Sequence, residues 1–289
     1  MMVIQIIIGF IGLVLIAIPF SKAKKKIQIK SIALAIVFQI LLAFLLIEIP
    51  VINDVFFYFS LGVEKLQLAT NAGTSFVFGY LSMGVGEELI FAFKILPLII
   101  VISSLTALLW YLNILPKIIK TISLIFEKIF NIGGPVGLGA TANIIMGQVE
   151  APLLVRPYLS KMSNKELLIL MTAGMSTVSG SIMIALVSML QIQFENINLV
   201  QHLITASILS IPAAIMYANI LIPSDSVTDY KESKISKIYE SSMDAITKGT
   251  RDGLEIAVNV GAILIAFIAI VYLVDSVLAL LPNINGQNV

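Results

Sequence analysis

The sequence predicts an all-α integral membrane protein with about six transmembrane helices, one re-entrant hairpin and interfacial amphipathic helices. Of its 289 residues, 58% are hydrophobic and 12% charged, and the mean hydropathy is +1.02. Soluble domains carry about 25% charged residues, so this chain is expected to lie in a membrane. Its apolar residues form runs close to the ~20 helical residues that cross a hydrocarbon core. The formal net charge of +1 gives no reason to expect nucleic-acid binding.

The residue types exclude several kinds of chemistry. The chain has no cysteine and one histidine, His202, so disulfides, thiolate metal sites and histidine clusters are excluded. Paired catalytic carboxylates and serine–lysine or serine–histidine arrangements are not recognisable, and Thr247–Arg251 does not follow the phosphate-binding pattern GxxxxGK[ST]. We therefore expect neither an enzyme nor a bound cofactor.

The first part, residues 1–113, is expected to form a scaffold of three transmembrane helices and one outer surface helix. The first span is Val3–Phe20, and a lysine-rich loop follows it at Lys22, Lys24, Lys25, Lys26 and Lys30. The positive-inside rule makes this loop cytoplasmic and puts the N-terminus outside. Ser31–Ile49 then returns to the outer face.

The scaffold continues with a less apolar stretch. Asn53–Leu68 mixes aromatic and charged residues and is predicted to be an interfacial helix on the outer side. Asn71–Glu88 contains four glycines and is predicted to be a loop that leads into the next helix. Leu89–Leu112 spans inward, with a kink at Pro97.

The second part, residues 114–222, is expected to be the transport region. It starts with Leu115–Phe130, an amphipathic cytoplasmic surface helix that carries three lysines. The two apolar runs of 136–160 are each too short to span, so we expect a re-entrant hairpin there. Two further spans follow: Asn164–Leu190, which is predicted to be broken at Met175–Ser181, and Leu199–Ile222.

The last part holds the one long charged stretch and a final helix. Residues 223–253 are predicted to be a cytoplasmic loop with some helix in it, and 254–289 to hold the last span, Leu254–Leu281, with a short tail. In this layout every lysine-rich loop falls on the same side of the membrane, provided that the hairpin is not a crossing.

The hairpin tip is the strongest candidate site. The segment Ala142–Leu159, ANIIMGQVEAPLLVRPYL, contains Gly147, Gln148 and Glu150 between apolar runs. A carboxylate at membrane depth needs a partner, a proton or a water-filled cavity. Amide and carboxylate groups together can bind the edge of a polar heterocycle such as a nucleobase. The alternative is a cytoplasmic loop in which Glu150 is merely solvated.

A second candidate site combines Asn143 with the interrupted segment Met175–Ser181. An amide oxygen, hydroxyls and backbone carbonyls freed by an unwound helix suit a small cation such as Na⁺. The alternative is helix–helix packing, because small residues also line helix interfaces in membranes.

These motifs resemble those of the concentrative nucleoside transporter family. The similarity rests on ANIIMGQVEAPLLVRPYL and on MTAGMSTVSGSIM at Met171–Met183, and it extends to GTSFVFGYL, FAFKILPLII and AVNVGAILIAFIAI elsewhere in the chain. The resemblance implies a homotrimeric, inverted-repeat, elevator-type carrier in the inner cell membrane, which imports nucleosides together with Na⁺ or H⁺. The residues present would form the first part of such a carrier.

The resemblance also implies roles for individual residues. Nucleoside contacts would come from Gly147, Gln148, Val149, Glu150 and Ile182. In sodium-coupled members, Na⁺ would be held by Asn143, Met146, Thr177 and Val178. Met146 and Val178 would bind it through their backbone carbonyls. Val149 stands where the family usually has threonine, which removes a hydroxyl group from the base site.

The sequence also departs from the family in length. Family members usually continue with a second hairpin, a second broken helix and a final spanning helix, and we recognise none of these here. This departure leads to an alternative expectation: a truncated member without transport activity, or a half-transporter that needs a companion chain.

Overall fold

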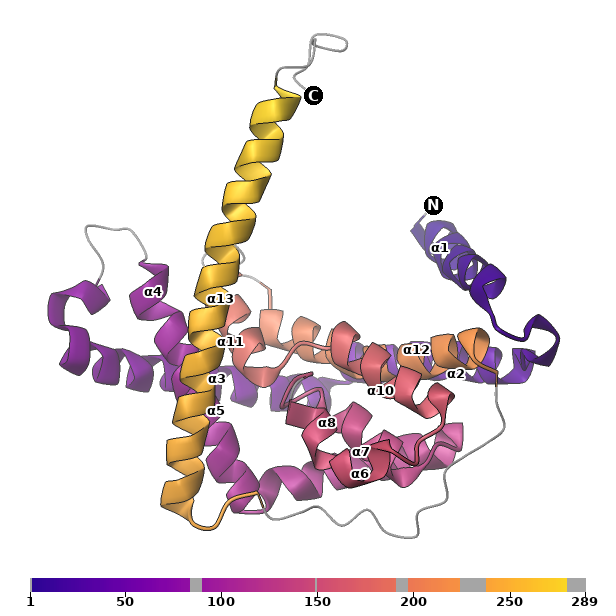
Figure 1. The fold of residues 1–289 in the computed structure, drawn as a ribbon, viewed down its shortest axis with the longest axis horizontal. Helices are drawn as coiled ribbons and strands as arrows, with labels where there is room; N and C mark the ends of the chain where they lie inside the picture. Colours follow the sequence, from indigo (N-terminus) through magenta and orange to yellow (C-terminus); the bar gives the residue numbers. More distant parts are fainter. Residues whose placement is uncertain (1, 84–89, 149, 191–196, 224–237, 280–289) are drawn as a thin grey trace.

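The computed structural model describes residues 2–83, 90–148, 150–190, 197–223 and 238–279. Within these ranges the chain forms helices and turns, with no β-strand. The N-terminal helices are α1 (Met2–Ala17), η1 (Ile18–Phe20), η2 (Lys24–Lys26), α2 (Ile29–Glu48), α3 (Pro50–Phe78) and η3 (Gly79–Met83). The middle of the chain forms α4 (Phe91–Lys94), α5 (Leu96–Tyr111), α6 (Ile114–Phe130), α7 (Gly134–Ala142), α8 (Glu150–Leu154) and α9 (Arg156–Leu159). The remaining helices are α10 (Asn164–Ser176), α11 (Gly180–Leu190), α12 (Leu199–Leu221) and α13 (Ser242–Leu278) (Figure 1).

The helices agree with a protein that crosses a membrane several times. Five described stretches are long and apolar enough to span: Ile29–Glu48, Phe91–Tyr111, Asn164–Leu190, Leu199–Leu221 and Ser242–Leu278. A shorter apolar stretch, Ile8–Phe20, lies where the first span was predicted. Together they fit the prediction of about six transmembrane helices, which is confirmed at the level of the fold.

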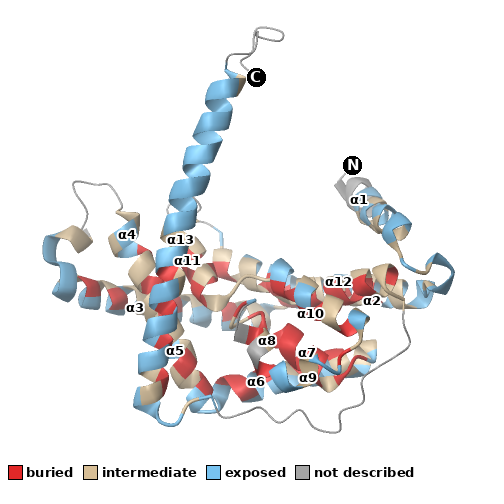
Figure 2. Ribbon diagram, in the orientation of Figure 1, coloured by how far each residue is buried: buried red, intermediate tan, exposed pale blue. Residues whose placement is uncertain are grey.

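The most buried element is the short helix α7, which is surrounded by α6, α10 and α12 (Figure 2). Every residue from Pro135 to Ala142 is buried. Glycines make this possible: a Cβ added at Gly137 would lie 2.8 Å from Glu127 Cγ, and one at Gly139 would lie 2.5 Å from Leu170 Cδ1. The hairpin is therefore anchored in the centre of the protein, with side chains of α6 and α10 packed directly on the backbone of α7.

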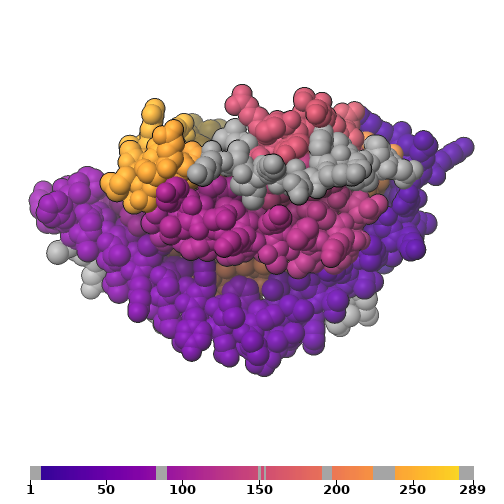
Figure 3. Space-filling view, turned by 90° about the horizontal axis from the view of Figure 1, so that it is seen from below, coloured from indigo at the N-terminus to yellow at the C-terminus, as the bar shows by residue number. Residues whose placement is uncertain are grey.

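Helices α5 and α13 form a second unit. A Cβ added at Gly249 would lie 2.8 Å from the carbonyl oxygen of Ser103, and one at Gly253 would lie 2.8 Å from Ile100 Cα. In the space-filling view from below, the orange start of α13 lies beside the magenta region of the chain (Figure 3). The second half of α13 extends away from the body and is exposed (Figure 2).

The break predicted at Met175–Ser181 is present, as the gap between α10 and α11. The kink predicted at Pro97 stays a prediction. A turn at Ile95 separates α4 from α5, but Ile95 keeps right-handed helical φ and ψ angles, and Pro97 occupies the first turn of α5. A proline is favourable there because the backbone N–H groups of a first helical turn have no partner within the helix.

One loop prediction was wrong. Asn53–Leu68 was expected to be a separate surface helix and Asn71–Glu88 a loop, but α3 is continuous as far as Phe78. The hydroxyl groups of Thr70 and Thr74 each donate to the carbonyl oxygen four residues earlier, at 2.8 Å. Both threonines are buried, so tertiary packing stabilises a helix that the glycines alone would weaken. Residues 84–88 of the predicted loop lie outside the described residues.

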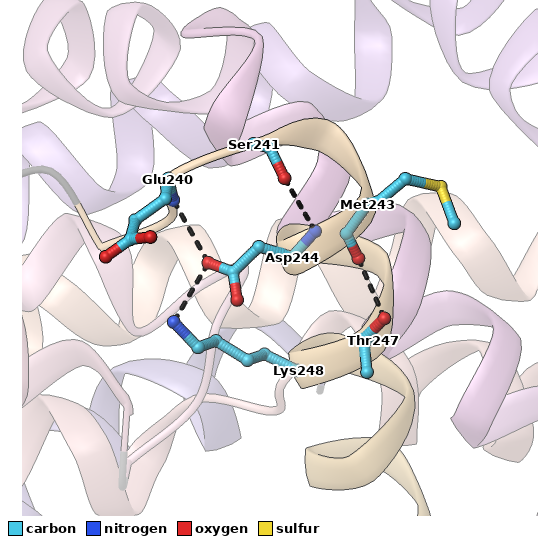
Figure 4. Close-up of polar contacts among 6 residues, drawn as sticks. All are labelled: Glu240, Ser241, Met243, Asp244, Thr247 and Lys248. Carbon is cyan, nitrogen blue, oxygen red and sulfur yellow. Dashed lines mark hydrogen bonds and ion pairs between the residues drawn. The ribbon is translucent and has the colours of Figure 1, made fainter.

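The boundary of the last helix also differs from the prediction. The last span was expected to begin at Leu254, after a charged loop with some helix in it, but α13 begins at Ser242. Its first turn is capped by Ser241, whose hydroxyl oxygen accepts from the backbone N–H of Asp244 at 3.1 Å (Figure 4). The Lys248 ammonium group donates to the carboxylate of Asp244 at 2.9 Å. Residues 224–237 lie outside the described residues, as does the tail from residue 280.

Candidate functional site: a hairpin turn packed on a broken helix

The candidate site is built where two irregular segments meet. One is the turn of residues 143–148, which connects α7 to α8, and the other is the break of residues 177–179 between α10 and α11. A Cβ added at Gly139 of α7 would lie 3.4 Å from Val155 Cγ2, so the two arms of the hairpin lie side by side. The turn is thus the tip of a helical hairpin, and the re-entrant placement of this hairpin in the membrane stays a prediction.

Gly147 adopts a backbone conformation on which the turn at this tip depends. Its φ angle of +93° lies in a region that residues with a side chain rarely adopt. Gly147 is buried, and an added Cβ would lie 2.8 Å from Ser179 Cβ. Both the backbone angle and the close approach to the broken helix therefore require glycine at this position.

Hydrogen bonds join the turn to the broken helix. The backbone N–H of Gly180, the first residue of α11, donates to the carbonyl oxygen of Ile145 at 2.9 Å. The hydroxyl of Thr177 lies 3.4 Å from the carbonyl oxygen of Asn143 and donates to that of Ala173 at 2.9 Å. These bonds satisfy polar groups that a helix break leaves without helical partners.

Asn143 is the most informative side chain of the site. It is fully buried, and its amide nitrogen donates to the carbonyl oxygen of Gly139 at 3.1 Å. Its Oδ1 atom is buried without a hydrogen-bond partner among the described residues. An unsatisfied buried polar atom costs about 1–3 kcal/mol. An acceptor held in this way is suited to a cation or a water molecule that would satisfy it.

Two serines of α12 support the break, and the sequence analysis did not identify them. The hydroxyl oxygen of Ser207 accepts from the backbone N–H of Val178 at 3.3 Å. The hydroxyl of Ser210 donates to the carbonyl oxygen of Ser176 at 2.8 Å. A sequence signal existed, because serines three residues apart share one face of an otherwise apolar helix.

The start of α10 is fixed by a capping box, also missed. The hydroxyl oxygen of Ser163 accepts from the backbone N–H of Glu166, whose carboxylate accepts from the backbone N–H of Ser163. The spacing S-x-x-E at the end of the hairpin is the recognisable signature of this motif. The capping box sets where the helix that carries the break begins.

The structure brings together most of the predicted cation residues. Asn143 and Thr177 are joined by the contact described above, and Met146 and Val178 lie in the same turn and break. Their identity as a Na⁺ site stays a prediction, because proximity of oxygen atoms does not identify an ion.

The residues predicted to contact the nucleoside differ in how exposed they are. Gln148 is exposed, and its Cβ lies 3.3 Å from the position of a Cβ added at Gly174. Ile182 is partly buried and packs against a cluster that includes Ile99 of α5 and Ala257 of α13. Val149 and the side chain of Glu150 lie outside what the structure describes.

The fold and the site define a class of protein. A helical hairpin that meets a broken helix, inside a bundle of apolar helices, is the arrangement by which secondary transporters form binding sites within the membrane. Three family models match the chain: "Na+ dependent nucleoside transporter N-terminus" at residues 3–81, "Nucleoside recognition" at 92–193, and "Na+ dependent nucleoside transporter C-terminus" at 202–289. The chain belongs to the concentrative nucleoside transporter family.

Individual relatives agree with this assignment. The chain is 32% identical to an uncharacterized transporter, YutK, of Bacillus subtilis, over 94% of this chain and 66% of the relative. It is 32% identical to the nucleoside permease NupC of Helicobacter pylori, over 93% of this chain and 64% of NupC. The structure of CNTnw in an inward-facing substrate-bound state is similar with a TM-score of 0.83 and 30% identity, over 96% of this chain and 66% of that chain.

The extent of these matches is itself a finding. Almost all of this chain aligns, but it spans only 66% of the length of YutK and of the CNTnw chain. The fold is therefore part of an elevator-type transporter fold. The match alone therefore does not assign to this chain the solute that a full-length relative transports.

Proposed function

We propose that this chain binds a nucleoside at the hairpin tip and takes part in its cation-coupled import across the cell membrane. The observation that carries the proposal is the buried, unpartnered Oδ1 atom of Asn143 close behind the exposed tip residue Gln148. A polar atom oriented in this way inside an apolar protein is expected to serve a ligand. Membership of the family supports a nucleoside as the transported solute.

In this proposal the hairpin tip recognises the nucleobase. The amide of Gln148 supplies two donors and one acceptor, and the carboxylate of Glu150 supplies acceptors, which together match the edge of a heterocyclic base. Gly147 lets the ligand approach the backbone closely, since it has no side chain. Val149 would present an apolar side chain to the base where a threonine would present a hydroxyl group. Ile182 would add a second apolar side chain.

The cation is proposed to be carried with the nucleoside. Its ligands would be the Asn143 Oδ1 atom, the Thr177 hydroxyl and the carbonyl oxygens of Met146 and Val178. This set of neutral oxygens suits Na⁺, which unwound helices of transporters bind through carbonyl groups. Proton coupling is the other form of the proposal, and the experiment below separates the two.

Topology and assembly complete the proposal. We place the N-terminus outside and the lysine-rich loop of residues 22–30 in the cytoplasm, as the positive-inside rule requires. The protein would lie in the inner membrane of the cell as a homotrimer in contact with lipid.

The test is an equilibrium binding measurement on the full chain in lipid nanodiscs. A panel of purine and pyrimidine nucleosides is titrated with Na⁺ or with choline, at pH values from 5.5 to 8. We expect saturable binding of at least one nucleoside, strengthened by Na⁺ or by acidic pH according to the coupling ion. If the whole panel shows no saturable binding in any condition, the proposal is wrong.

A second candidate, a half-transporter that needs a companion chain, is favoured by one observation. Gln148 at the tip and the neighbouring α10 side chains Met171 and Met175 are exposed, the last two by 63% and 80%. A site open on one side is expected to bind weakly until a further surface covers it. Nucleoside binding without uptake in cells that express the chain alone would favour this candidate, and uptake would exclude it.

A further inference from the structure

A small polar cavity lies outside the site described above. It is about 20 Å³ in volume, enough for one water-sized occupant. On one side it is lined by Met146 of the hairpin turn and Ser181 of α11, and on the other by Ser103 and Thr106 of α5 and Asp252 of α13. The cavity is therefore lined by both units of the fold, the hairpin with its broken helix and the α5–α13 pair.

Several side chains that line this cavity carry oxygen atoms. Three lining side chains from the two units carry aliphatic hydroxyls, and Asp252 adds a carboxylate. Asp252 is exposed, and no hydrogen bond or ion pair of its carboxylate is found among the residues that the structure describes. The nearby ammonium of Lys248 is bound to Asp244 at 2.9 Å. One carboxylate beside several neutral oxygens complements a single positive charge.

The size and charge of the cavity limit the occupant. Ca²⁺ requires six to eight oxygen ligands and usually several carboxylates, and no group of three acidic or histidine side chains able to hold a metal ion occurs among the described residues. A cavity of about 20 Å³ has room for one small ion.

We propose that Asp252, together with the hydroxyls of Ser103, Thr106 and Ser181, binds a small monovalent cation such as Na⁺ between the two units. This position differs from the one proposed at Asn143, with which it shares only Met146 as a neighbour. A cation held here links the hairpin unit to α5 and α13 and stabilises the arrangement in which they are in contact. That role rests on the proposed carrier function, whereas the binding itself does not.

The test measures binding of radioactive sodium to the full chain in nanodiscs, without nucleoside. Asp252→Asn keeps the shape of the side chain and removes its charge, and Thr106→Val removes one hydroxyl at nearly constant shape. Asp275→Asn is the matched control, because Asp275 lies on the exposed far part of the same helix. Thermal unfolding of each variant confirms that it is folded.

We expect Asp252→Asn to remove one equivalent of bound Na⁺ or to weaken that equivalent at least tenfold, Thr106→Val to weaken it less, and Asp275→Asn to leave it unchanged. Li⁺ should compete and choline should not. Unchanged Na⁺ binding in Asp252→Asn would overturn the inference and leave the cavity with water only. Equal competition by choline would overturn it as well.

The same experiment separates this inference from the proposed function. Asn143→Ala removes the other cation position, so its loss of Na⁺ binding reports on the coupling site alone. If Asn143→Ala and the nucleoside titrations show no effect while Asp252→Asn loses Na⁺, the proposed function fails and the cavity site stands. The reverse pattern rejects the cavity site alone.

Discussion

The backbone N–H of Gly180 donates to the carbonyl oxygen of Ile145 at 2.9 Å, which joins the first residue of α11 to the turn of the hairpin. A Cβ added at Gly180 would lie 3.1 Å from that same oxygen. The hairpin turn therefore takes the place of the helical turn that α11 lacks at its start. Because of this bond, a change in the turn is transmitted directly to the broken helix.

Gly147→Ala should destabilise the tip. The alanine Cβ would require a φ angle near +93° and would lie 2.8 Å from Ser179 Cβ. We expect a loss of about 1–3 kcal/mol in stability, measured as a lower unfolding temperature in detergent, with weaker nucleoside binding. Gly73→Ala is the control, because nothing lies within 4 Å of its added Cβ and α3 is helical there. Equal behaviour of the two variants would refute the packing argument.

Gly253→Ala should separate α5 from α13. The new Cβ would lie 2.8 Å from Ile100 Cα and 2.8 Å from Ser103 Cβ, where the backbone of α5 cannot easily yield. Overpacking of this kind costs about 1–3 kcal/mol, which limited proteolysis or thermal unfolding would detect. The control Gly261→Ala meets only the flexible end of Leu96, at 3.3 Å. If the control is destabilised as strongly, close packing is not the cause.

Gln148→Ala and Glu150→Gln should weaken nucleoside binding and leave membrane insertion intact. Loss of hydrogen bonds to a charged or amide group is worth about 1–3 kcal/mol, which corresponds to roughly a 5- to 150-fold change in Kd. Equilibrium binding with the preferred nucleoside measures the effect, and Thr247→Ala serves as the control, because this exposed side chain forms its hydrogen bond within α13. Unchanged binding constants in both tip variants would remove the hairpin from base recognition.

Asn143→Ala should reduce the dependence of nucleoside binding on the coupling ion. The variant removes the buried Oδ1 atom that has no partner among the described residues. In the wild type we expect Na⁺ to raise the unfolding temperature, since a ligand bound only to the folded state stabilises it. That rise should be smaller in the variant, and a rise of the same size would argue against Asn143 as a ligand.

The start of α13 should respond to acid. The backbone N–H of Glu240 and then the ammonium of Lys248 lower the pKa of Asp244, which lies in the charged first turn of α13, ten residues before the predicted span Leu254–Leu281 (Figure 4). A carboxyl group whose pKa is lower in the folded state stabilises that state above its unfolded pKa of about 3.9. The contribution is lost as the pH falls through the folded pKa.

Amide hydrogen exchange of the first turn of α13 checks this prediction. We expect protection factors to be constant from pH 7 to 5 and to fall below about pH 4. In Asp244→Asn the protection should be lower at pH 7 and should lose its pH dependence. Persistence of the acid response in that variant would assign it to another group.

Hydrophobic patterning was sufficient to predict much of the fold. The apolar runs that became α2, α12 and the second half of α13 are long, and a helix that crosses a membrane must satisfy its own backbone hydrogen bonds. The break at Met175–Ser181 was also predictable, because clustered small polar residues weaken the helical hydrogen-bond ladder locally. The tip motif around Gln148 led to the family assignment.

The errors have a common cause. The loop predicted from Asn71 is helical as far as Phe78, and the end of the predicted charged stretch, from Ser242, forms the first turns of α13. Both segments have contacts with distant parts of the chain that stabilise them. Thr70 and Thr74 are buried against other helices, and Gly249 allows α13 to pack directly on α5. Local propensity contains no information about such contacts.

Residue types and their spacing along the chain were enough to establish a helical membrane protein, the position of the hairpin tip and the family to which the chain belongs. Tertiary structure alone decided which groups meet around that tip: the serines of α12 at the helix break and Ser179 against Gly147. It also decided that Asp252 and Met146 line one small cavity. The physical reason is that periodicity reports which residues share a face of one helix, whereas the crossing of two helices depends on how their side chains pack.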